Sequence, residues 1–252
     1  MSNFRFVPLV LATYSLMLAC CGVTKRQATA LALPETDPAP VAALPATPTS
    51  KTSLDLSFTV DPTRSIGTID TTLDPEGVIL GPRKGVCKTP LKGSIKAALL
   101  TKPDGSRHLQ ITRVSLSTTK ASELVYEWSA LLGEIRCTIP TGQLKITDHQ
   151  LAGPSPLDGR NSFAKEGNLF SVTCPAHILG SGLVLKEAVG ERKENLDIPV
   201  TEPVSVAGSC NHQDGQLVLH IPRAVLRDHF DLGKATLDLV FTGDITATCP
   251  EP

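Results

Sequence analysis

Two cysteine–histidine pairs are the residues of this chain best suited to holding a metal. Cys174 and His177 enclose two residues, and Cys210 and His212 enclose one. Two thiolates and two imidazoles would suit zinc or copper. The spacing matches no common zinc pattern, however, and disulfide formation would compete for both sulfurs. We therefore predict no metal and no other cofactor.

A second cluster of reactive side chains is Asp228-His229-x-Asp231. A carboxylate beside a histidine fixes its tautomer and raises its basicity, which would suit a general base of a hydrolase. The chain has no Gly-x-Ser-x-Gly, His-Glu-x-x-His or Cys-x-x-Cys motif. We assign no catalytic residue, and a carboxylate-based hydrolase is the least favoured of three functions.

The first residues have the layout of a secretory signal. Arg5 precedes an apolar run over 6–19, which is shorter than the roughly 20 residues that cross a bilayer as a helix. We predict export. The alternative is a membrane anchor that continues to Lys25-Arg26.

The run ends in "LMLACCG", residues 16–22, which resembles the lipobox of bacterial lipoproteins. The resemblance implies lipidation of Cys20 or Cys21 and a membrane-tethered protein of the cell envelope, on the outer membrane because no aspartate follows the cysteine. Cleavage near Gly22 and release as a soluble protein is the alternative. The segment 22–52, rich in Pro, Ala and Thr, is predicted to be an extended tether.

The five remaining cysteines would meet an oxidising compartment, where disulfides are the default. They are Cys87, Cys137, Cys174, Cys210 and Cys249. All but Cys87 share strand phase with apolar neighbours and should point into a core. We predict one bridge between Cys87 and Cys137, and a second from Cys249 to either Cys210 or Cys174.

The periodicity of residues 53–252 predicts an all-β fold, either a sandwich or a barrel. Apolar residues alternate with polar ones over 54–60, 236–241 and 244–249, and turn signals separate the runs. Only "PRAVLRDHF" at 222–230 invites a short helix, because proline suits a first helical turn.

An internal duplication is suggested by "DGSRHLQITRVSL" at 104–116 and "DGQLVLHIPRAVL" at 214–226. We predict two small β domains, 53–150 and 169–252, joined by a Gly/Pro/Ser-rich linker. A signal peptide over 1–21 and the tether would precede them.

Composition disfavours nucleic acid as a partner. The formal net charge is −1, and no basic patch interrupts the mixed charges. "FTVDPTRS" at 58–65 is similar to the opening strand of YceI-like proteins, and this resemblance implies an exported barrel that holds an isoprenoid lipid. We favour a non-catalytic envelope lipoprotein with a structural or binding role; the alternative is a carrier of a small ligand, lipid or metal.

Overall fold

The computed structural model describes residues 52–75, 80–233 and 235–250. The predicted signal peptide with Cys20 and Cys21, and the tether up to residue 51, lie outside the described residues. All of these described residues belong to one compact unit. Within the described ranges, no helix is both long enough and apolar enough to span a membrane.

The predicted all-β class is confirmed, and the sole helix of the described residues is α1, Leu185–Ala188. The strands are β1 Thr52–Val60, β2 Ile66–Pro75, β3 Arg83–Thr101, β4 Arg107–Thr118, β5 Ser122–Glu127, β6 Glu134–Ile139, β7 Lys145–Gln150, β8 Ser155–Pro156, β9 Ser162–Thr173, β10 Pro175–Gly180, β11 Glu191–Asn195, β12 Val204–Gln213, β13 Gln216–Asp231 and β14 Ala235–Pro250.

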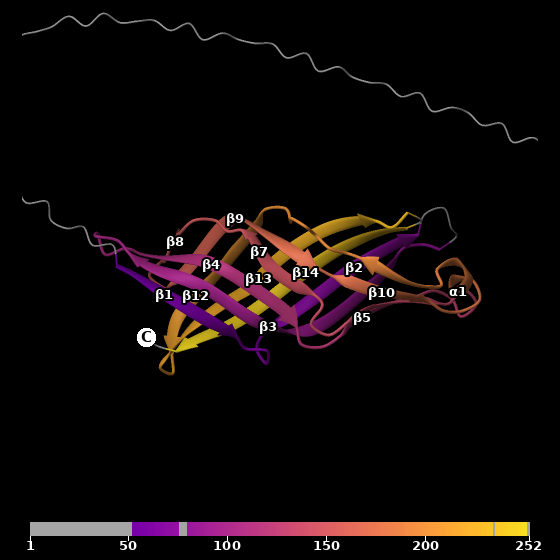
Figure 1. The fold of residues 1–252 in the computed structure, drawn as a ribbon, viewed down its shortest axis with the longest axis horizontal. Coiled ribbons are helices and arrows are strands. Elements are labelled where there is room, and N and C mark those ends of the chain that lie inside the picture. Colours follow the sequence, from indigo (N-terminus) through magenta and orange to yellow (C-terminus); the bar gives the residue numbers. More distant parts are fainter. Residues whose placement is uncertain (1–51, 76–79, 234, 251–252) are drawn as a thin grey trace, which may run out of the picture. The chain divides into compact units, whose positions relative to one another are not determined.

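The larger sheet closes on itself and forms a barrel (Figure 1). Antiparallel pairing runs from β1 to β3, β4, β7, β9, β12, β13 and β14, and β14 pairs back onto β1 and β2. Closure pairs the backbone of the first strand with that of the last at Thr59↔Thr248 and Val60↔Ala247.

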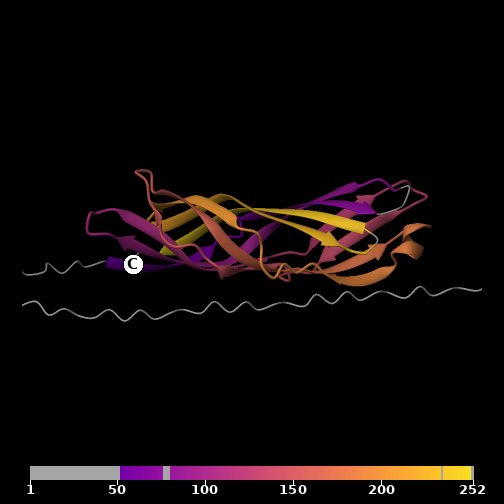
Figure 2. The ribbon, with the colours of Figure 1, turned by 90° about the horizontal axis from the view of Figure 1, so that it is seen from above.

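Four of these strands have continuations that form a second sheet, in the order β11-β10-β6-β5. β5 follows β4 after residues 119–121, β10 follows β9 after Cys174, β7 follows β6 after 140–144, and β12 follows β11 after 196–203. The second sheet therefore extends one side of the barrel wall towards the end that carries α1 (Figures 1 and 2).

The period-two pattern has the predicted effect in β1, where Leu56, Phe58 and Val60 are buried while the residues between them are exposed. On β3 the outward face presents a lysine at every fourth position. These residues are Lys84, Lys88, Lys92 and Lys96. These charged side chains lie on the outer surface of the barrel, whereas the apolar side chains of β3 between them, such as Leu91 and Ile95, are buried.

The helix predicted over 222–230 is wrong, because this segment lies within β13. Ile221 pairs with Ile245 and Ala224 with Gly243, so Pro222 and Arg223 together face Asp244 in a β-bulge. Proline lacks the N–H that a ladder requires, and a bulge is one of the few positions in a sheet that accepts it.

Strands from the two predicted domains lie in one sheet, since β2 pairs with β14 along the whole length of β2. The predicted linker 151–168 belongs to the same sheet, because it contains β8 and the first half of β9. The Ser155 hydroxyl donates to the Ala164 carbonyl oxygen at 2.8 Å, and Ser155 also pairs with Leu109 of β4. The proposed duplication remains a prediction.

Candidate ligand cavity

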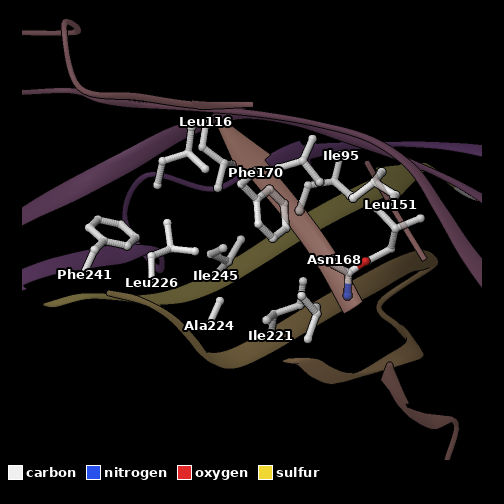
Figure 3. Close-up of a pocket in the computed structure, with 14 residues that line it drawn as sticks. Ile95, Leu116, Leu151, Asn168, Phe170, Ile221, Ala224, Leu226, Phe241 and Ile245 are labelled. Carbon is white, nitrogen blue, oxygen red and sulfur yellow. The ribbon is translucent and has the colours of Figure 1, made fainter. Parts of the chain in front are cut away.

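Side chains from most strands of the ring converge on a cavity inside the barrel (Figure 3). Its volume is about 40 Å³. Its lining is aliphatic and aromatic except for one asparagine: Ile95, Ile111, Val114, Leu116, Ile146, Leu151, Asn168, Phe170, Val206, Ile221, Ala224, Leu226, Phe241 and Ile245.

Irregularities in the strand register surround this cavity. Extra residues interrupt the ladders at Thr112 of β4, His149 of β7, Glu166–Gly167 of β9 and Pro222–Arg223 of β13. A bulge bends its strand and increases the local twist. Each of these bulges lies within a few residues of the cavity lining.

A second void of about 20 Å³ adjoins the first further along the barrel. The two share Ile146, Leu226 and Phe241 as lining residues. Leu196 and Ile198, from the segment between β11 and β12, line the second void and not the first. The interior therefore holds two apolar spaces in line, separated by three shared side chains.

Asn168 is the one polar side chain of the larger cavity, and both its amide oxygen and its amide nitrogen are hydrogen-bonded. Its Oδ1 accepts from the Ala152 N–H at 3.1 Å, and its Nδ2 donates to the carbonyl oxygens of Lys165 at 3.0 Å and Val204 at 3.3 Å. These bonds hold the 151–152 segment and the bulge of β9 in place. The cavity thus offers hydrocarbon contacts and no free polar partner.

The wall between β3 and β5 is joined by side chains, since no backbone ladder connects these strands. The Tyr126 hydroxyl lies 2.7 Å from the Thr71 hydroxyl, which donates to the Gly85 carbonyl oxygen at 2.9 Å. Arg83 Nε donates to the Glu127 carbonyl oxygen at 2.8 Å. Burial raises the pKa of Tyr126 well above its usual value, so the phenol stays protonated and keeps this contact.

The boundary between β12 and β13, in contrast to that between β3 and β5, is bonded over only part of its length. These strands pair from Gln213↔Gln216 to Ser209↔His220, and there the ladder ends. Beyond it, the described residues 196–208 and 221–231 share no hydrogen bond or ion pair, while 196–201 bond to β9 and its junction with β10. A surface cleft of about 320 Å³ lies over this seam.

The predicted disulfides do not form: all five cysteines of the described residues are free thiols. Cys210 and Cys249 are buried on the two strands that flank β13, opposite Leu219 and Leu217. An intervening strand separates them by roughly 10 Å, beyond the Cα separation of about 7 Å that a disulfide tolerates.

The other predicted pairings fail for similar reasons. β5 lies between Cys87 and Cys137: the Cys87 thiol contacts Ser122 and the backbone of Glu123, while Cys137 pairs with Leu124 on the far side of β5. Cys174 lies just beyond the end of β9 and Cys210 beside its start, since Cys210 N donates to the Asn161 carbonyl oxygen. The shared inward phase of the cysteines, predicted from sequence, buries them without bringing them into bonding distance.

These buried thiols should resist alkylation. Burial is the main cause that raises the pKa of Cys174 to about 12 and that of Cys137 to about 11. At pH 8 the thiolate fraction of Cys174 is then roughly 1,000-fold below that of a thiol with its ordinary pKa. We expect iodoacetamide at pH 8 to modify Cys174 only after unfolding, as measured by peptide mass spectrometry. Rapid modification of the folded protein would contradict its burial.

The four candidate metal ligands are dispersed. His177 faces outward and its Nε2 lies 2.9 Å from Glu191 Oε1, whereas Cys174 faces the interior. Cys210 and His212 lie near the other end of the barrel, beside the β12–β13 turn. Within the described residues, no group of three or more Cys, His, Asp or Glu side chains is arranged to hold a metal ion.

The acidic cluster around His229 does not orient the ring as the sequence suggested. His229 Nδ1 lies 2.7 Å from Asp238 Oδ1 on β14, a partner that the local motif did not predict. The Asp228 carboxylate accepts from the backbone N–H of His229, and that of Asp231 accepts from Gly233. The imidazole is 61% exposed, and this His–Asp pair has the geometry of a surface ion pair.

No protein-family model matches the chain, and no curated protein does. Among solved structures, the chain is similar to Ail, the attachment invasion locus protein of Yersinia pestis. The complex of Ail with the heparin analogue sucrose octasulfate shares 8% identity at a TM-score of 0.31, and a second Ail structure shares 10% at 0.30. Each match covers 77% of this chain and 99% of Ail. Likeness of this degree carries no argument about function.

Proposed function

We propose that this protein is a non-catalytic carrier of the bacterial cell envelope whose barrel binds the hydrocarbon chain of a small apolar ligand. The observation that carries the proposal is the larger cavity, because its lining is apolar and both polar atoms of its single amide are hydrogen-bonded. Empty apolar cavities exclude water and bind apolar molecules.

The alignment of the two voids supports a long ligand over a compact one. Leu226 and Phe241 line both spaces, so rotamer changes at these side chains would join them without breaking a strand pairing. A chain lying through both voids would contact β4, β7, β9, β13 and β14 at once. Each buried methylene would contribute about 0.8 kcal/mol.

The location in the envelope rests on the N-terminal sequence. We propose that the leader directs export and that Cys20 or Cys21 carries the lipid anchor, with the segment up to residue 52 as a tether. Intact-mass analysis of the mature protein tests this part alone: an acylated N-terminal cysteine supports it, and a soluble, unacylated chain contradicts it.

Binding to the cavity is tested with a naphthylamine dye whose fluorescence increases in apolar surroundings. We expect saturable binding by the purified protein, and at least about tenfold weaker binding by Ala224→Phe, whose ring would occupy the cavity. Ala207→Phe is the matched control, because Ala207 is exposed on the outer face of β12. Equal affinities for both variants would show that the dye binds elsewhere.

A further inference from the structure

We propose that the seam between residues 196–208 and 221–231 is the portal through which the ligand enters, and that its polar head stays in the cleft over this seam. The inference rests on the proposed function, and it adds the route and the kind of head group. The seam is the one long boundary between neighbouring wall segments that carries neither a ladder nor a side-chain bond among the described residues.

Both voids reach this seam. Val206 on one edge and Ile221, Ala224 and Leu226 on the other line the larger cavity. Ile198 lines the smaller void and also the floor of the surface cleft. A single layer of side chains therefore separates the interior from the cleft.

Opening the seam would break no backbone hydrogen bond, because none crosses it. Residues 196–201 keep their bonds to the other neighbour, among them Ile198 to Val172 and Thr201 N to the Phe170 carbonyl oxygen at 2.9 Å. The β3–β5 boundary, in contrast, is held by the Tyr126 and Arg83 bonds. Local opening favours segments with few hydrogen bonds, so separation should occur between β12 and β13.

The other end of the seam is fixed. Gly208 of β12 approaches β13 so closely that an added Cβ would lie 2.2 Å from the His220 carbonyl oxygen. The ladder from Ser209 to Gln213 begins directly beyond it. The two strands would therefore separate from this point like a hinge, towards the end that carries the cleft.

The cleft has the polar groups that the cavity lacks. Glu202, Arg227, Asp228 and His229 line it together with Val200 and Thr201. A head group with a single charge would be repelled by the cleft residues of the same sign. A neutral hydroxyl, in contrast, can donate a hydrogen bond to a carboxylate and accept one from the guanidinium. The occupant we infer is a long-chain amphiphile with an uncharged, hydrogen-bonding head.

The test uses the full mature chain, labelled with ¹⁵N, and long-chain alcohols that carry a nitroxide either beside the hydroxyl or at the methyl end. The label beside the hydroxyl should broaden the amide signals of Val200, Glu202 and Arg227 most. The label at the methyl end should broaden those of Ile95 and Phe170. Among unlabelled compounds of equal chain length, the alcohol should bind roughly tenfold more tightly than the fatty acid.

The outcomes separate the two proposals. Broadening of Ile95 and Phe170 by the methyl-end label, with the hydroxyl-end label near another part of the barrel, would overturn the portal and leave the carrier function intact. Absence of any interior broadening would overturn the carrier function itself. In stopped-flow kinetics, Arg227→Trp should slow association about fivefold, whereas Lys88→Trp on the outer face of β3 should not; equal rates would also overturn the portal.

Discussion

Replacing Gly93 with alanine should prevent the barrel from folding. Gly93 has a φ of 145°, and an added Cβ would lie 1.9 Å from the Ser115 carbonyl oxygen of β4. The clash is with backbone, so no rotamer change relieves it, and β3 and β4 would have to separate. We expect the free energy of unfolding to fall by more than about 4 kcal/mol, measured by urea denaturation followed by circular dichroism.

Gly153→Ala is the matched control, because an alanine there would meet no atom within 4 Å and the backbone is not left-handed. Its stability should differ from wild type by less than about 1 kcal/mol. A Gly93→Ala protein as stable as the control would contradict the close approach of β3 and β4 on which ring closure depends.

The second large effect is expected from charge placed inside the barrel. Ile95 and Lys96 are adjacent on β3, but Ile95 is 1% exposed and lines the cavity while Lys96 faces outward. Ile95→Asp should cost about 5 kcal/mol or more at pH 7, because the carboxylate would be buried without a partner. Lys96→Asp should change stability by less than about 1 kcal/mol.

The pH dependence of the Ile95→Asp protein gives a second check. Burial would raise the pKa of the new carboxyl above its unfolded value near 3.9. The loss of stability caused by the buried carboxylate is therefore greatest at neutral pH. It becomes smaller as the pH falls through the raised pKa, because protonation removes the buried charge. An equal loss of stability in the Ile95→Asp and Lys96→Asp proteins at every pH would contradict an apolar interior and a solvent-exposed outer face.

The fold class could be predicted from sequence because alternation is a local signal. Leu56, Phe58 and Val60 alternate with polar residues, and the barrel buries the apolar set. Ring closure could not be predicted in this way. It depends on the pairing of β14 with β1 and β2, and nothing local in "ATLDLVFTGD" identifies those partners.

The errors came from residues with more than one structural use. Pro222 suits a first helical turn, and it equally suits a bulge, which is where it lies in β13. The prediction that Cys210 and Cys249 face the interior was correct. Alternation, however, predicts only which side of the sheet a residue faces, and it does not predict which strands are neighbours. The intervening β13 was therefore missed.

The cavity itself had almost no signal in the sequence. Its lining is ordinary core composition, and the extra residues of the bulges beside it, such as Thr112 and His149, differ in no visible way from other strand residues. Gly167, in the bulge of β9, was the one local hint, since glycine inside a strand often marks an irregularity.

Native mass spectrometry tests the central claim, that the closed barrel holds one apolar chain. The mature protein, first stripped of lipid and then mixed with a long-chain alcohol, should carry a single alcohol molecule, and Ala224→Phe should lose this adduct while Ala207→Phe keeps it. A wild-type spectrum without any adduct up to the solubility limit of the alcohol, or the same adduct on all three proteins, would contradict the account.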